Sequence, residues 1–345
     1  MKRWFSIWVL VALGLSLAMA GCGSGASSGS GAPSSSTGSG SPAVTLKLGH
    51  NSHEESVTNR AFKSWANTLS QKTGGKLTLE VFPQNQLGTN KELSEQTGLG
   101  SLDMSAQGLS SYVDFGVEEG YLAKVPFLFN SLDASIAFWQ GEDGKTLMKK
   151  VEPKGVRVLS VGLNRMPRQM ASKNKPLNSP ADVKGLKIRA GDTATNSALK
   201  VLGAVPTNIA LNEMYTAVSQ GMVDVVELPL DYIYSYAMYE VAKHLTLTNH
   251  TFDLQWVIIN KARFDSLPQE YQKVITDTIP DLEKENNKAM EADFGDTLNK
   301  IKAKNMNVIE TDRAKWTAII PELVPELEKT WPSTKGYYDK IMKLK

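Results

Sequence analysis

The sequence predicts an α/β fold arranged in two lobes. From Ala43 onward, short apolar segments typical of strands alternate with amphipathic segments typical of helices, which predicts sheets covered on both faces. The chain has 345 residues, 41% of them hydrophobic, which is enough for a sizeable hydrophobic core and favours two lobes over one. The formal net charge is +2, and no basic stripe is interleaved with aromatic residues, which argues against a nucleic-acid partner.

Each element follows from a local pattern. Apolar runs predict the strands, which we place at residues 45–50, 76–82, 101–107, 156–163, 168–173, 185–190, 223–229 and 254–260. Helical periodicity predicts helices at residues 58–75, 90–99, 132–150, 193–203, 212–220, 230–243 and 268–305. The last helix contains Pro280, which we expect to kink or divide it, and its length suits a helix that braces two lobes.

The N-terminal segment has the pattern of an exported lipoprotein. A basic start and an apolar stretch precede a small-residue site that ends in Cys22, the only cysteine of the chain, so no internal disulfide is expected. The site resembles a bacterial lipobox, which predicts a signal peptide at residues 1–22 and lipidation of Cys22. A stop-transfer helix is the alternative, but the stretch is short for a membrane span. Residues 23–42 are almost wholly Gly, Ser, Ala, Thr and Pro, which predicts a flexible tether outside the cell membrane.

Two arginines are the strongest candidates for ligand binding. Arg189 ends the short apolar run "GLKIRA", where alternate residues point to opposite faces, and Gly191 and a helix start follow it. A strand end, a glycine and a helix N-terminus together favour an anion. Arg168 begins another strand, and two arginines that converge on one carboxylate make charge-assisted bidentate bonds. Arg165 lies close by in the sequence and competes with Arg168 for that role; a structural salt bridge remains the alternative for each arginine.

Signals for catalysis or metal binding are weak. His50 and His53 have an H-x-x-H spacing, but no third ligand is apparent, so we expect no metal. The sequence "GEDGKT" at residues 141–146 lacks the spacing of a phosphate-binding loop and reads as a turn and helix start. No nucleophile motif or pair of acid and base carboxylates is evident, so we expect neither catalytic residues nor a cofactor.

Tyrosines crowd the segment at residues 230–244. Most of them are expected to pack within the protein, while Tyr232, which closely follows a strand end, could face a ligand.

Several segments together resemble the solute-binding subunits of tripartite ATP-independent periplasmic (TRAP) transporters. They include "DVKGLKIRAGDTATNSALKVLGAVP", "LNEMYTAVSQGMVDVVELPL", "YEVAKHLTLTNHTF", "VPFLFNSLDAS" and "GVRVLSVGLNRMPRQMASKNKPL", and the resemblance covers nearly everything after Ala43. It implies a two-lobed clamp with a long helix across both lobes. The lobes are expected at residues 43–166 with 255–294, and at residues 167–254 with 295–345.

The resemblance also implies the site residues. It identifies Arg189 as the arginine that grips a carboxylate and Arg168 as a supporting one, and it places Gln255 in the pocket. The sequence departs from the family at three positions, where Leu228 replaces a frequent Asn, Leu211 replaces a frequent aromatic residue, and Asp192 stands where sialic-acid-binding members have Asn. Fewer polar contacts favour a less polar organic acid over a sugar acid.

The resemblance implies a transport function without enzymatic activity. The ligand is a small organic acid, and the partners are the small and large membrane subunits of a permease driven by an ion gradient. The protein is expected to be a monomer, anchored by lipid to the membrane in the periplasm or on the outer face. A sensory subunit that presents a ligand to a receptor and a surface enzyme that acts on organic acids, with Asp192 or Glu227 as base, remain the alternatives.

Overall fold

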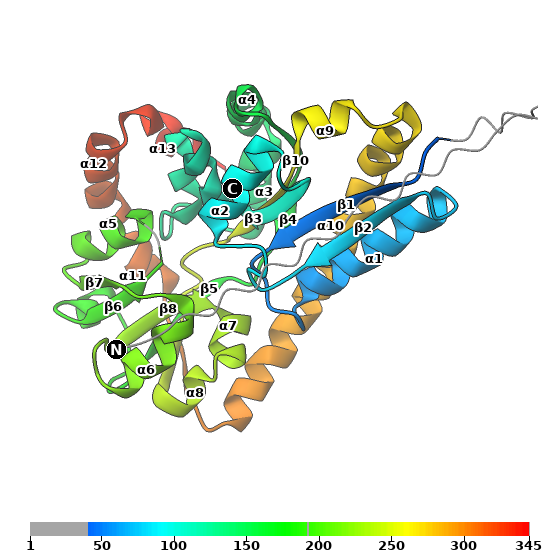
Figure 1. Ribbon diagram of the computed structural model, residues 1–345. Helices are drawn as coiled ribbons and strands as arrows, with labels where there is room; N and C mark the ends of the chain where they lie inside the picture. The colour runs from blue at the N-terminus through cyan, green and yellow to red at the C-terminus, as the bar shows by residue number, and fades with distance from the viewer. Residues whose placement is uncertain (1–40, 192, 345) are drawn as a thin grey trace, which may run out of the picture. The chain divides into compact units, whose positions relative to one another are not determined.

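The computed structural model describes residues 41–191 and 193–344, and Ser41 to Lys345 form one compact unit. The predicted signal peptide, the predicted lipidation site Cys22 and nearly all of the predicted tether lie outside the described residues, as does Asp192. Two sheets organise the described chain, and Figure 1 labels most of their strands.

The first sheet has five strands in the order β2-β1-β3-β10-β4. Strands β1, β2 and β3 are parallel, and β10 is antiparallel to both β3 and β4. The strands are β1 (Val44–His50), β2 (Leu77–Phe82), β3 (Met104–Gly108), β4 (Val156–Asn164) and β10 (Leu254–Asn260).

The second sheet has six strands in the order β11-β9-β5-β8-β6-β7. β5 is antiparallel to β8 and β9, whereas β6 is parallel to β7 and β8. The strands are β5 (Arg168–Ser172), β6 (Lys187–Ala190), β7 (Val205–Asn208), β8 (Val225–Pro229), β9 (His244–Leu247) and β11 (Asn307–Glu310).

Helices cover the sheets and connect their strands. The α-helices are α1 (Val57–Lys72), α2 (Asn90–Leu99), α3 (Leu132–Gln140), α4 (Glu142–Val151), α5 (Thr193–Val201), α6 (Met214–Ser219), α7 (Leu230–Ser235), α8 (Met238–Val241), α9 (Lys261–Asp265), α10 (Gln269–Ala303), α11 (Arg313–Thr317), α12 (Ile320–Thr330) and α13 (Tyr337–Ile341). Two 3₁₀ helices, η1 (Leu109–Phe115) and η2 (Glu118–Lys124), follow β3.

Helix α10 contacts both halves of the described unit, the half built around the first sheet and the half built around the second. It packs against α1 and β4 of the first half and against α7 of the second, as Figure 1 shows. The side chains of Asn286 and Asn287 donate to the carbonyls of Asn164 and Gly162, which fixes α10 against β4. Pro280 lies inside α10 and does not divide it, contrary to one of the two outcomes expected from the sequence. Packing on two sides of a long helix compensates for one lost backbone hydrogen bond.

Two helices predicted as single pieces are broken. The helix predicted at 132–150 is divided into α3 and α4 because Gly141 adopts an extended backbone between them. The helix predicted at 230–243 is divided into α7 and α8 at Ala237, whose φ is 52° in the left-handed region. Strands β7, β9 and β11 were not predicted, because each is only four residues long and their apolar pattern is weak.

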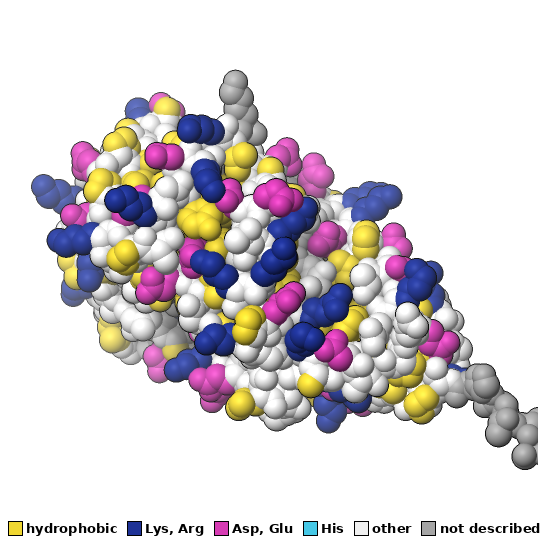
Figure 2. Space-filling model, turned by 90° about the horizontal axis from the view of Figure 1, so that it is seen from above, with side chains coloured by type: hydrophobic (Ala, Val, Ile, Leu, Met, Phe, Trp, Pro, Cys, Tyr) yellow, Lys and Arg dark blue, Asp and Glu magenta, His cyan; other side chains and the backbone are white. Residues whose placement is uncertain are grey.

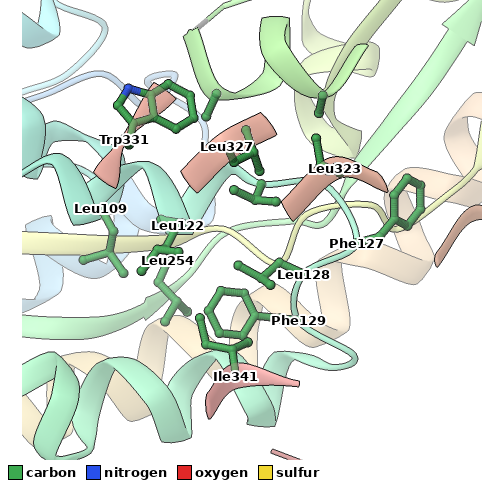
Figure 3. Close-up of a cluster of buried hydrophobic side chains, with 14 of the residues drawn as sticks. Leu109, Leu122, Phe127, Leu128, Phe129, Leu254, Leu323, Leu327, Trp331 and Ile341 are labelled. Carbon is green, nitrogen blue, oxygen red and sulfur yellow. The ribbon is translucent and has the colours of Figure 1, made fainter. Parts of the chain in front are cut away.

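The C-terminal helices share a hydrophobic core with both sheets. Figure 3 shows Leu323, Leu327 and Trp331 in the same cluster of buried side chains as Leu122 and Leu128. The same core contains Trp256 of the first sheet and Ile188 of the second, which makes it continuous across the described unit. On the face seen in Figure 2, acidic and basic side chains are interspersed, in keeping with the nearly balanced charge.

Candidate functional site

The topology of the second sheet brings both candidate arginines to one edge. Strand β8 lies between β5 and β6. Arg168 at the start of β5 lies opposite Pro229 at the end of β8, and Arg189 near the end of β6 lies opposite Val226. An antiparallel strand starts where its neighbour ends, and parallel strands end together. Both arginines therefore lie toward the same edge of the sheet, on either side of β8.

The first sheet presents its strand ends in the same way. β1 ends before Asn51, and its parallel neighbour β3 ends at Gly108. β4 ends just before Arg165, which begins the short crossover to β5. In α/β sheets, ligands bind beyond the carboxyl ends of the strands.

A cavity of about 130 Å³ lies where these strand ends meet. That volume is close to the roughly 150 Å³ of an apolar cavity that holds benzene, so it suits a small molecule. The described residues that line the cavity come from both halves of the unit: Asn51, Asn90, Gly108, Ser110, Lys124, Arg165, Arg168, Arg189, Gly191, Leu211, Leu228, Pro229 and Tyr232.

Arg168 is held in a buried ion pair with Glu227. Its Nε and Nη2 donate to the two carboxylate oxygens at 2.5 and 2.7 Å, and Nη2 also donates to the Glu227 carbonyl at 3.1 Å. His250 lies 3.3 Å from the same carboxylate through Nε2, and its Nδ1 contacts the Thr248 hydroxyl at 2.7 Å. Burial acts to raise the pKa of Glu227, but Arg168 and the hydrogen bond from His250 hold it well below its usual range. Glu227 is therefore a poor general base.

A second buried carboxylate, Asp253, forms ion pairs with two other cations that line the cavity, Lys124 and Arg165. It accepts from Lys124 Nζ at 2.5 Å, and Arg165 Nη1 lies 3.4 Å from the same oxygen. Burial acts to raise the pKa of Asp253, but Lys124 and Arg165 lower it overall, so the group is ionised. Arg165 also donates through Nη2 to the Tyr232 hydroxyl at 3.1 Å.

Arg189 is oriented by the backbone around it. The side chain is 5% exposed, and its Nε donates to the Ile209 carbonyl at 2.9 Å. A Cβ atom at Gly191 would lie 3.2 Å from Nη1 and 3.3 Å from Nη2, so glycine allows the end of the guanidinium to pass close to the chain. This arrangement positions a delocalised cation in the cavity wall.

The structure brings most of the proposed site residues together. Arg189, Arg168, Tyr232, Leu211 and Leu228 all line the cavity.

The two remaining candidates, Gln255 and Asp192, are not among the described residues that line the cavity. Gln255 is absent from the described lining, although it is paired with Gly108, which belongs to the lining. It is fully buried, and neither its Nε2 nor its Oε1 has a hydrogen-bond partner among the described residues. Asp192 lies outside the described residues, so its relation to the cavity stays a prediction.

Several lining residues were missed by the sequence analysis. Asn51 and Gly108 directly follow or end predicted strands, so the rule used for Arg189 could have identified them. Arg165 was considered only as a competitor of Arg168, and the structure places both in the lining. Lys124 ends the 3₁₀ helix η2. No local sequence pattern marks it as a site residue, because its place in the cavity depends on Asp253 far along the chain.

The weaker motifs have local structural explanations. His50 is fully buried; its Nε2 contacts Asn59 Oδ1 at 3.1 Å, and its Nδ1 accepts from the Ser52 backbone at 3.2 Å. "GEDGKT" begins α4. Residues 41–191 and 193–344 contain no group of three or more His, Cys, Asp or Glu suited to a metal ion, and no helix long and apolar enough to cross a membrane.

The comparison with protein families decides the relationship. The DctP family model, described as bacterial extracellular solute-binding protein, family 7, matches residues 48–330. The chain belongs to this family. It is 30% identical over 83% of its length to a solute-binding protein of Verminephrobacter eiseniae, of which 85% is covered.

Further relatives and solved structures support the relationship. The chain is 29% identical over 82% of its length to the C4-dicarboxylate-binding periplasmic protein DctP of Rhodobacter capsulatus, of which 86% is covered. Among solved structures, a TRAP periplasmic solute-binding protein from Polaromonas sp. JS666 bound to D-erythronate matches with a TM-score of 0.78 and 25% identity, covering 87% of this chain and 99% of that one. The two-lobed α/β fold with a long helix, expected from the sequence, is thus confirmed.

Proposed function

We propose that this family 7 solute-binding protein captures a small organic acid between its two sheets by gripping the carboxylate with Arg189. The observation behind the proposal is the convergence of Arg189, Arg168, Arg165 and Lys124 on one cavity that lies beyond the strand ends of both sheets. A planar guanidinium matches the two oxygens of a carboxylate, and a bond between charged groups is stronger in a buried site than in water.

The roles of the other cations follow from their partners. Arg168 has two of its nitrogens engaged by Glu227, so it contributes positive potential and orientation to the site. Lys124 and Arg165 share Asp253 in the same way. Gln255 has two buried amide atoms without partners, and such groups commonly complete their hydrogen bonds with a ligand or water. We keep it as a polar residue of the site.

The cavity favours a small acid with an apolar portion. Leu211 and Leu228 line it, and its volume of about 130 Å³ is modest. The D-erythronate complex of the Polaromonas protein and the C4-dicarboxylate named for the Rhodobacter protein are acids of four carbons, and erythronate is itself polyhydroxylated, so these ligands support the small size of the acid and not its apolar portion. We therefore favour a short organic acid over a larger sugar acid, whose many hydroxyl groups would lack partners beside two leucines.

Delivery and location complete the proposal. A lipid on Cys22 and the tether at residues 23–42 would hold the protein at the outer side of the cell membrane. The loaded, closed form would then pass the acid to a TRAP permease of one small and one large membrane subunit. Docking as a monomer would leave the surfaces of both lobes available to that permease. The alternative of a surface enzyme is disfavoured because Glu227 is ionised and engaged by Arg168.

A thermal-shift panel tests the function. The protein is unfolded and refolded to remove any bound acid, and its unfolding temperature is then measured with keto acids, hydroxy acids, dicarboxylates, aromatic acids and sugar acids. A ligand that binds only the native state raises that temperature with its concentration. Arg189→Ala is expected to lose about 2–5 kcal/mol of binding free energy, roughly 30-fold to several-thousand-fold in affinity. Arg189→Lys should also weaken binding, because a point charge cannot make the two-pronged contact.

The matched control is Arg157→Ala. Arg157 is exposed on β4, with its guanidinium over the Phe264 ring, and it does not line the cavity. Its variant should bind the same acids as the wild type. Hits restricted to neutral solutes, or a carboxylate that Arg189→Ala binds with unchanged affinity, would show that Arg189 is structural.

A further inference from the structure

Tyr232 joins the two halves of the described unit at the wall of the cavity. Its hydroxyl donates to the Asn51 carbonyl at 3.1 Å and accepts from Arg165 Nη2, also at 3.1 Å. The side chain is 5% exposed and lines the cavity. Tyr232 belongs to α7, directly after β8 of the second sheet, whereas Asn51 directly follows β1 of the first.

The ring of Tyr232 also lies close to Arg165 and Tyr236. The Arg165 guanidinium lies 5.5 Å from the centre of the Tyr232 ring, and Arg165 is itself held by Asp253. Tyr236, one turn further along the segment, lies 5.6 Å away, ring centre to ring centre. Burial raises the pKa of the Tyr232 hydroxyl to about 12, so the hydroxyl keeps its proton and remains a donor at neutral pH.

We propose that Tyr232 is a latch that holds the two lobes in the closed arrangement, through its paired hydrogen bonds to Asn51 and Arg165. The Asn51 carbonyl is backbone of the first lobe, and Arg165 belongs to the crossover between the sheets. Separation of the lobes, which a ligand needs in order to enter or leave, breaks the bond to Asn51. The inference rests on the proposed function in one respect only, namely that the two lobes open and close around a ligand.

The expected change in the ratio of closed to open molecules follows from the hydrogen bonds that Tyr232→Phe removes. Tyr232→Phe keeps the ring but removes the acceptor for Arg165 and the donor for Asn51. In the closed arrangement both groups would then be buried without this partner, whereas in an open arrangement water replaces it. The substitution therefore penalises the closed arrangement selectively and should lower the ratio of closed to open molecules about threefold to tenfold.

The test measures lobe separation without any ligand. The full chain carries Cys22→Ser, together with Glu95→Cys on α2 and Thr216→Cys on α6, two exposed positions on opposite halves of the unit. Spin labels on the two new cysteines report the distribution of distances by pulsed electron resonance. The wild-type latch should give a population at short distance, and Tyr232→Phe should shift it toward long distances, while the unfolding temperature shows that both proteins are folded.

Tyr234→Phe is the matched control. Tyr234 lies on the same helix, its ring packs near Lys300 Nζ, and it does not line the cavity. The control should keep the wild-type distribution. An unchanged distribution in Tyr232→Phe, an equal shift in both variants, or a wild type with only long distances would each overturn the latch. Because no acid is present, a failure of carboxylate binding in the thermal-shift panel is a separate result.

Discussion

Replacing Glu227 by glutamine tests the buried ion pair that orients Arg168. The substitution nearly preserves shape, but it removes the negative charge facing the guanidinium of Arg168, whose side chain is only 8% exposed. Arg168 would keep its bond to the Glu227 backbone carbonyl and lose the charge-assisted pair to the carboxylate. Breaking one partner of a buried ion pair costs about 3–5 kcal/mol of folding free energy, because the other charge stays buried.

The expected shift in melting temperature follows from the size of the folded unit. For about 300 residues the entropy of unfolding is on the order of 0.6 kcal/mol per kelvin, so this loss lowers Tm by roughly 5–8 °C. Differential scanning calorimetry measures the shift. The control is Asp277→Asn, which breaks an exposed pair with Lys273 at 2.6 Å and should cost less than about 1 kcal/mol.

A double-mutant cycle separates the charge effect from packing. Arg168→Met should also destabilise, because among the described residues it leaves the buried Glu227 paired with His250 alone. The double variant Arg168→Met with Glu227→Met should lose less stability than the sum of Arg168→Met and Glu227→Met, because no charge of the pair remains buried. Additive losses, or a Glu227→Gln variant no less stable than Asp277→Asn, would refute the assignment of a stabilising ion pair.

Three further predictions concern the cavity and the residues beside it. Gly191→Ala places a Cβ 3.2 Å from Arg189 Nη1 and should weaken carboxylate binding about threefold to tenfold with little change in Tm, as titration calorimetry can measure; unchanged affinity would contradict the close packing. Leu228→Asn adds an amide to the lining and should shift the order of thermal-shift hits toward sugar acids, whereas an unchanged order would argue against Leu228 as a specificity residue. Burial raises the pKa of the Asp231 carboxyl from 3.8 to about 6, so the unfolded state releases this proton first and stability falls as the pH rises from about 4 to about 6. Asp231→Asn should therefore gain on the order of 1–3 kcal/mol in urea unfolding at neutral pH and nothing below about pH 4; an equal gain at both would point to a cause other than ionisation.

The sequence by itself determined most of the elements and singled out Arg189 as the leading candidate for the site. Strands β1 and β10 and helices α1 and α10 have clear apolar patterns, so their positions follow from the local sequence. Arg189 could be singled out because its neighbours, a strand end and a glycine, are adjacent in the chain. The breaks at Gly141 and Ala237 were missed because one-residue changes of backbone direction leave the apolar period on both sides intact.

Only the tertiary structure decided which groups meet in the cavity. Sheet order places Arg168 and Arg189 at one edge, and the pairing of Arg168 with Glu227 depends on the register between β5 and β8. Lys124 meets Asp253 across a long separation in the sequence, and Tyr232 reaches Asn51 of the other sheet. Such contacts depend on long-range packing of strands and helices, which local residue patterns do not encode, so the partner of each buried charge could not be read from the chain alone.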